Sequence, residues 1–111
     1  MPDQYTEVLS KIQSHQLPGL ELGDGQVHPH YGGYSIQNAP SSICGWLGAP
    51  QLGAVPLDPQ ITMSLADEYQ NVVLILMDAL SLVRFTRWVE AGLIPVWSEL
   101  IERGVYTPLT S

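Results

Sequence analysis

Apolar residues follow a helical spacing near the start of the chain and a different, continuous pattern further along. Between Tyr5 and Gln16 the apolar positions recur as on one face of a helix, and Leu17-Pro18-Gly19 ends the pattern. The next stretch, 18–59, contains eight glycines, six prolines and only three charged residues, which favours turning or extended backbone. Its apolar run around Ser41 to Leu47 predicts one short helical turn that packs onto a core.

The pattern changes after Gln70. Asn71 to Met77 is a continuous, largely β-branched apolar run that ends in the carboxylate of Asp78, which is typical of a strand buried on both faces. Apolar positions from Leu82 to Val89 then return to helical spacing, and Gly92 can end that helix.

A second helix follows at once. Pro95 suits a first helical position, the apolar stripe runs to Ile101, and Gly104 closes the helix. Val105 to Thr107 then resembles another strand. The order strand, helices, strand predicts a right-handed βαβ crossover, so the expected fold class is α/β with a mostly parallel sheet and flanking helices.

This order also predicts two parts of unequal completeness. Residues 1–68 form a helix and a proline- and glycine-rich extension, and residues 69–111 begin an α/β catalytic core. A strand that is apolar on both faces needs neighbours on both edges, yet this part supplies one partner strand and helices for one face. We therefore expect the core to be truncated at the C-terminus, with the missing sheet downstream.

Composition narrows the classes of function. The chain of 111 residues is 45% hydrophobic and 14% charged, which indicates one folded unit, and its net charge is −7. No lysine or arginine occurs between Lys11 and Arg84, so nucleic-acid binding is not expected.

The chain shows no leader-like segment and no apolar run long enough for a bilayer, which predicts a cytoplasmic protein without a membrane contact. The single cysteine, Cys44, is expected to be a small buried hydrophobe.

Asp78 is the first candidate for chemistry. It lies where the C-terminal end of a parallel strand would meet the following loop, the edge at which open α/β sheets place ligands. Its hard oxygens suit a divalent cation, although one carboxylate does not make a metal site. The alternative is that Asp78 caps the helix beginning around Leu80.

Three stretches together resemble type I phosphodiesterase/nucleotide pyrophosphatase proteins of the alkaline phosphatase superfamily. They are Asn71 to Leu80, Ile94 to Tyr106 and the closing Thr107-Pro108-Leu109-Thr110-Ser111. The family pattern is an apolar strand ending in Asp-Gly, a helix, a helix end with Gly-Val, and a strand leading into a Thr- or Ser-centred loop. The resemblance covers about the last 42 residues.

The resemblance implies the N-terminal fragment of a phosphodiester or pyrophosphate hydrolase that acts on a small phosphate ester or nucleotide. It implies two divalent metals, usually Zn²⁺, with Asp78 as a ligand of one, and a Thr or Ser nucleophile that forms a covalent phospho-enzyme. The remaining ligands are expected downstream, so the 111-residue chain alone is expected to be inactive.

Two departures from the family pattern concern the site itself. Ala79 stands where the family has Gly; alanine there either crowds the backbone near the metal or is tolerated if its φ is negative. The nucleophile is expected just beyond Ser111; Thr110 and Ser111 are weaker candidates, whose alternative role is to satisfy loop backbone groups.

Other readings stay open. His28 and His30 could bind a metal, but exposed loop histidines are the simpler interpretation, and His15 can complement a helix dipole. Trp88 and Trp97 are expected in the core.

Alternative functions also stay open. Within the same superfamily, sulfatase-like hydrolases and cofactor-independent phosphomutases use the same strand-end Asp. The rival from another class is a non-catalytic α/β scaffold or binding module. Oligomeric state is not indicated.

Overall fold

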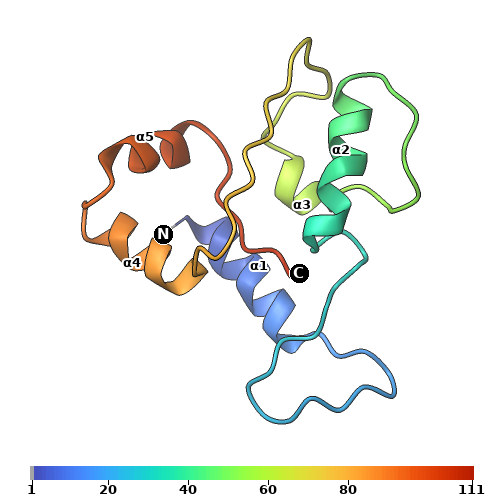
Figure 1. The fold of residues 1–111 in the computed structure, drawn as a ribbon, viewed down its shortest axis with the longest axis vertical. Coiled ribbons are helices and arrows are strands. Elements are labelled where there is room, and N and C mark those ends of the chain that lie inside the picture. The colour runs from blue at the N-terminus through green and yellow to red at the C-terminus, as the bar shows by residue number, and fades with distance from the viewer. Residues whose placement is uncertain (1) are drawn as a thin grey trace.

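The computed structural model describes residues 2–111, and its regular structure is helical. In chain order the helices are α1 (Asp3–Ser14), the 3₁₀ turn η1 (Ile36–Asn38), α2 (Ala39–Trp46), α3 (Pro59–Thr62), α4 (Leu82–Glu90) and α5 (Pro95–Arg103). Figure 1 shows α1 in the middle, with α2 and α3 on one side and α4 and α5 on the other.

Helix α1 carries the core. Val8 and Ile12 are buried on its inner face and pack with Tyr34 and Ile61, from the loop before η1 and from α3. Leu57, Val105 and Leu109 add partly buried cover. The amphipathic N-terminal helix predicted from the sequence is thus confirmed, and its stripe draws together segments from both halves of the chain.

The polar turn around η1 is buried as tightly as the apolar core. Asn38 is fully buried, and its side-chain oxygen accepts hydrogen bonds from the backbone N–H groups of Gly33 (3.2 Å) and Ser35 (2.9 Å). Its amide nitrogen donates to the carbonyl oxygens of Tyr31 and Val55, each at 2.9 Å. One side chain therefore ties the 31–35 loop to the 55–58 segment.

The short helices have local causes. The predicted turn near Ser41 to Leu47 is confirmed as α2, which has a proline in its first turn. Helix α3 was not predicted; the Asp58 side chain accepts from the N–H of Gln60 (2.8 Å), and Pro59 occupies the first turn.

The two helices predicted after Asp78 are confirmed as α4 and α5, but none of their residues is buried. Phe85 of α4 meets Trp97 of α5 edge to face at 5.5 Å, which joins the two helices to each other. Tyr106, in the segment after α5, stacks on Tyr5 of α1 at 5.0 Å. Trp88 and Trp97 keep 37% and 36% of their surface exposed, so the prediction that both lie in the core is wrong.

The predicted α/β fold with a parallel sheet is wrong: the part of the chain that the structure describes contains no sheet. Its β-pairing is a single parallel bridge between Ser35 and Thr110. The physical reason is that the expected partner strand is used elsewhere, because Val105 packs on the α1 core and Tyr106 stacks on Tyr5. Without a neighbouring strand, the apolar run 71–77 has no ladder to join.

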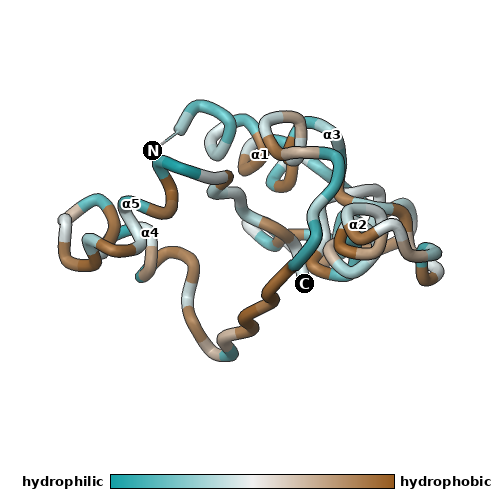
Figure 2. The backbone as a smooth tube through the Cα atoms, turned by 90° about the horizontal axis from the view of Figure 1, so that it is seen from above, coloured by the Kyte–Doolittle hydropathy of each residue, from teal (hydrophilic) through white to brown (hydrophobic). Residues whose placement is uncertain are grey.

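The run 71–77 therefore extends away from the core, as the continuous brown stretch in Figure 2 shows. The exposed fraction is 83% for Val73, 67% for Leu74, 71% for Ile75 and 74% for Leu76. Among the hydrogen bonds of residues 2–111, none joins a backbone group of this run to another backbone group. It is a bare apolar segment in solvent.

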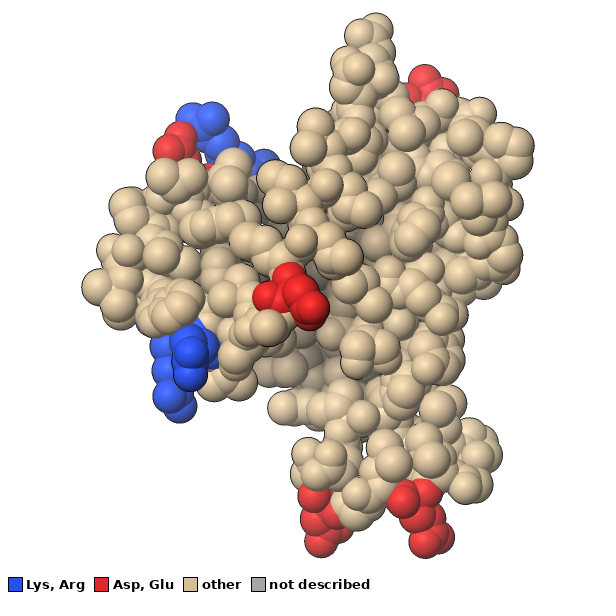
Figure 3. All heavy atoms as spheres, viewed as in Figure 1, with Lys and Arg blue, Asp and Glu red and all other residues tan. Residues whose placement is uncertain are grey.

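Charge is distributed unevenly. Arg84, Arg87 and Arg103 all belong to α4 and α5, whereas Lys11 is the one lysine or arginine of the first 80 residues. In Figure 3 the blue atoms gather over α4 and α5, and the face over α2 is almost free of charge.

Candidate functional site

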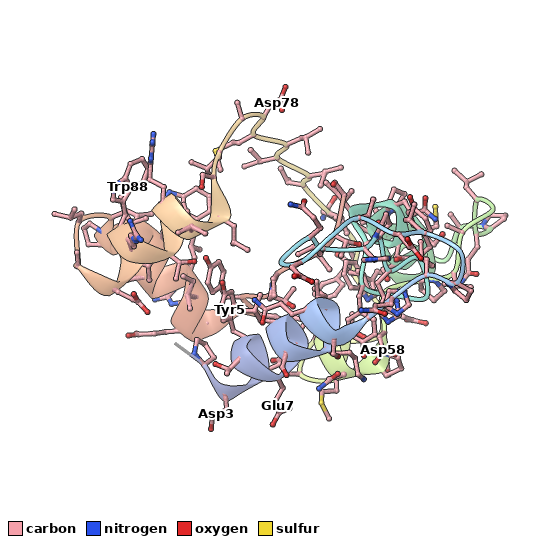
Figure 4. All side chains as sticks on the ribbon, turned by 90° about the horizontal axis from the view of Figure 1, so that it is seen from below. Asp3, Tyr5, Glu7, Asp58, Asp78 and Trp88 are labelled. Atoms are coloured by element: carbon pink, nitrogen blue, oxygen red, sulfur yellow. The ribbon has the colours of Figure 1, made fainter. Side chains whose placement is uncertain are left out.

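Asp78 lies at the apex of the loop between the apolar run and α4, and it points away from the rest of the molecule (Figure 4). It is exposed, and one of its carboxylate oxygens accepts from the adjacent N–H of Ala79 at 2.8 Å. The cap of α4 is Ser81, whose hydroxyl accepts from the N–H of Arg84 at 3.4 Å. Asp78 is therefore free of the helix-capping role that the alternative interpretation gave it.

The backbone just after Asp78 takes the left-handed conformation. Ala79 has φ of 57° and is the one non-glycine residue with positive φ among residues 2–111. The negative φ under which alanine would simply be tolerated in place of glycine is therefore not found here. A side chain in this region costs roughly 1–2 kcal/mol, which glycine avoids. Ala79 thus adopts a left-handed backbone conformation that glycine takes without strain.

We expect Ala79→Gly to raise the free energy of unfolding by about 0.5–1 kcal/mol, because relief of the left-handed strain exceeds the added entropy of the unfolded chain. The matched control is Ala91→Gly. Ala91 follows α4 with φ of −80°, so there the same substitution should lower stability by about 0.5–1 kcal/mol. Urea unfolding followed by circular dichroism measures both; a loss at both positions would contradict the left-handed assignment at Ala79.

Metal-binding groups do not converge on Asp78. Among residues 2–111 no cluster of three or more histidine, cysteine, aspartate or glutamate side chains could hold a metal ion. A zinc site needs about three or four protein ligands, so Asp78 can supply one and no more. The expectation of a metal-binding α/β chain is corrected accordingly: these residues do not form a complete metal site.

The two hydroxyl candidates differ in their surroundings. Thr110 is buried, with 6% of its surface exposed, and its hydroxyl accepts from the N–H of His30 at 2.9 Å and lies 3.3 Å from the carbonyl oxygen of Tyr34. Ser111 is exposed. A nucleophilic hydroxyl needs a base or metal beside it. The Thr110 hydroxyl instead satisfies loop backbone groups, as the alternative role supposed.

The histidines form a small cluster at the end of α1. His28 is buried, so its interpretation as an exposed loop histidine is wrong, and its Nδ1 accepts from the N–H of Leu17 at 3.1 Å. The rings of His15 and His30 stack with their centroids 3.9 Å apart. Burial lowers the pKa of His30, and the neighbouring His15 lowers it further. In stacked rings the nitrogen lone pairs lie in the ring planes and do not point at a common centre. The His15–His30 pair therefore holds the 28–30 loop against the end of α1 and does not offer two converging metal ligands.

Sequence reasoning missed one pocket beside this cluster. A cavity of about 280 Å³ lies between the end of α1 and the 23–28 loop, and its lining includes His15, Asp24 and His28. Its walls come from residues up to 15 positions apart in the chain, so a local pattern could not indicate it. It does not meet the Asp78 loop.

Comparisons with known proteins identify no family. No protein-family model matches the sequence, and neither a curated protein nor a solved structure matches it. Among residues 2–111 no helix is long and apolar enough to cross a membrane.

Proposed function

We propose that this chain supplies Asp78 as one metal ligand of a phosphate-ester hydrolase whose other ligands and nucleophile lie outside these 111 residues. The observation that carries the proposal is the exposed carboxylate at the tip of an apolar run, which has no ion-pair partner among residues 2–111 and does not cap α4. An acid held in this way keeps an oxygen free for a cation.

The backbone at Ala79 supports the same proposal. In the phosphodiesterase-like pattern that the sequence resembles, glycine follows the metal-ligating aspartate, and this chain has positive φ at the corresponding position. At this turn the carboxylate of Asp78 points outward from the end of the run, where a cation can approach it (Figure 4). Zn²⁺ is the cation that the resemblance implies, and a small phosphate ester or nucleotide is the substrate.

The reaction class follows from what a metal can do for a phosphate ester. Two cations, one of them held by Asp78, would supply charge stabilisation at the nonbridging and leaving oxygens of the ester and would favour the ionised form of a Thr or Ser hydroxyl. The role of Asp78 in such a site is to hold one cation and to neutralise part of its charge. The 111 residues alone should then show no hydrolysis.

The test begins with the coding sequence that follows codon 111. We expect it to continue in frame, and the complete product to hydrolyse bis(p-nitrophenyl) phosphate in a zinc-dependent manner. Asp78→Asn should abolish this activity, because the amide keeps the shape of the side chain and removes its charge. Asp67→Asn, which changes another exposed acid before the apolar run, is the control and should leave the activity intact.

Two results would overturn the proposal. One is a stop codon directly after Ser111, since no further ligands could then be encoded. The other is an active, zinc-dependent product in which Asp78→Asn and Asp67→Asn have the same small effect.

The second candidate function is a binding module without catalysis. The observation that favours it is the bare apolar run 71–77, because large exposed apolar patches mark interaction surfaces. It predicts a chain that associates through this run with or without a metal.

A further inference from the structure

The run 71–77 offers an unpaired backbone edge together with apolar side chains on both sides. Successive side chains of extended backbone point to opposite faces, and both sets are exposed here, Val73 and Ile75 on one face and Leu74 and Leu76 on the other. A short segment with high β-propensity, no charge, no proline and no glycine is the type of sequence that pairs with a copy of itself.

We infer that this run is a self-association site, at which two copies of the chain pair strand to strand in antiparallel orientation. The occupant of the surface is a second copy because the edge is uncharged along its whole length and identical edges complement each other around a two-fold axis. The pairing uses backbone groups that have no backbone partner within the described chain.

Charge selects the antiparallel orientation. With Leu74 at the two-fold axis, Asp78 of one copy lies opposite Gln70 of the other. A parallel, in-register pair would instead place Asp78 beside Asp78, and like charges directly opposite are destabilising.

The small area that two paired strands bury predicts assemblies larger than a two-stranded ribbon. A stable interface buries about 800 Å² on each partner, and an isolated two-stranded ribbon is marginal in water. Both faces of the paired ribbon stay apolar, so ribbons stack face to face as concentration rises. Dimers and larger assemblies are thus expected from the same segment, and neither needs a metal or a substrate.

The experiment is size-exclusion chromatography with light scattering on the 111-residue chain over a wide range of concentration. We expect a mass that rises with concentration, and Leu74→Lys should weaken the dimer by about two orders of magnitude or more, since it places two ammonium groups at the two-fold axis. Leu52→Lys is the matched control: Leu52 is also a loop leucine, exposed by 73% against 67% for Leu74. It should leave association unchanged.

Orientation has its own readout. In a Cys44→Ser background, a mixture of Gln70→Cys and Asp78→Cys chains should form the mixed disulfide faster than either chain links to itself, because only the antiparallel register brings these two positions together. Circular dichroism confirms that each variant keeps its helices. A monomer at every concentration overturns the inference, as does association that Leu74→Lys and Leu52→Lys affect equally. A Zn²⁺-dependent hydrolase activity of a longer product tests the proposed function separately.

Discussion

Asn38→Ala should lower the free energy of unfolding by about 3–4 kcal/mol, a large share of the stability of a chain this size. The side chain is fully buried and makes four hydrogen bonds with backbone groups of two separate loops. Alanine leaves the N–H groups of Gly33 and Ser35 and the carbonyl groups of Tyr31 and Val55 without that partner. Each unsatisfied buried group costs roughly 1–3 kcal/mol before water or relaxation compensates.

Asn71→Ala is the control for this measurement. Asn71 is exposed, and its side chain makes no hydrogen bond within residues 2–111, so its loss should change stability by less than about 0.5 kcal/mol. Urea unfolding at neutral pH compares the two. Asn38→Asp adds a second check: its carboxylate can still accept from the two N–H groups but faces two carbonyl oxygens, so it should also destabilise. Equal, small effects of Asn38→Ala and Asn71→Ala would show that the buried network does not form.

Helices α1, α2, α4 and α5 were predictable from the sequence because their signals are local. The apolar stripe of α1 and the Pro95 and Gly104 boundaries of α5 each arise within a few residues of where they act. The Asn38 network was not predictable, because it depends on which backbone groups the 31–35 and 55–58 segments bring to one place. Nothing in the sequence next to Asn38 distinguishes it from an exposed turn residue.

The sheet was predicted wrongly because the composition of a segment indicates that it is suited to a buried strand. It does not indicate whether a second strand lies beside it. The run 71–77 has the composition of a doubly covered strand, yet in this chain it is bare. The expected partner, Val105 to Thr107, is held against α1 instead, and Thr110 bridges to Ser35. Backbone pairing is a property of two segments, so one apolar run cannot establish it.

The candidate site was predictable only in part. The pattern indicated Asp78 at the end of an apolar run, and its exposure at a loop apex is a feature of the structure. The sequence could not decide between ligand and helix cap, whereas the contact of Ser81 with Arg84 assigns the cap elsewhere. The positive φ at Ala79 was likewise hidden, since alanine rarely takes that conformation.

Gly33→Ala should lower the free energy of unfolding by about 3–5 kcal/mol, because two penalties add at this position. Gly33 has φ of 118°, a conformation that disfavours any side chain. An added Cβ would also lie 2.8 Å from the backbone nitrogen of Asp58 and 3.1 Å from its Cα. These are backbone atoms, and the N–H of Asp58 donates to the carbonyl of Gly33 at 3.0 Å, so the two segments cannot separate without losing that bond.

Gly25→Ala separates the two penalties. Gly25 also has positive φ, 76°, but nothing lies within 4 Å of where its Cβ would be. Its substitution should therefore cost about 1 kcal/mol, the strain alone. Thermal and urea unfolding of both variants measure the difference, which is the cost of the collision with Asp58. If the two variants lose the same stability, the close approach of Gly33 to the start of α3 does not exist in solution. The hydrogen bond from the N–H of Asp58 to the carbonyl of Gly33 would then not form either.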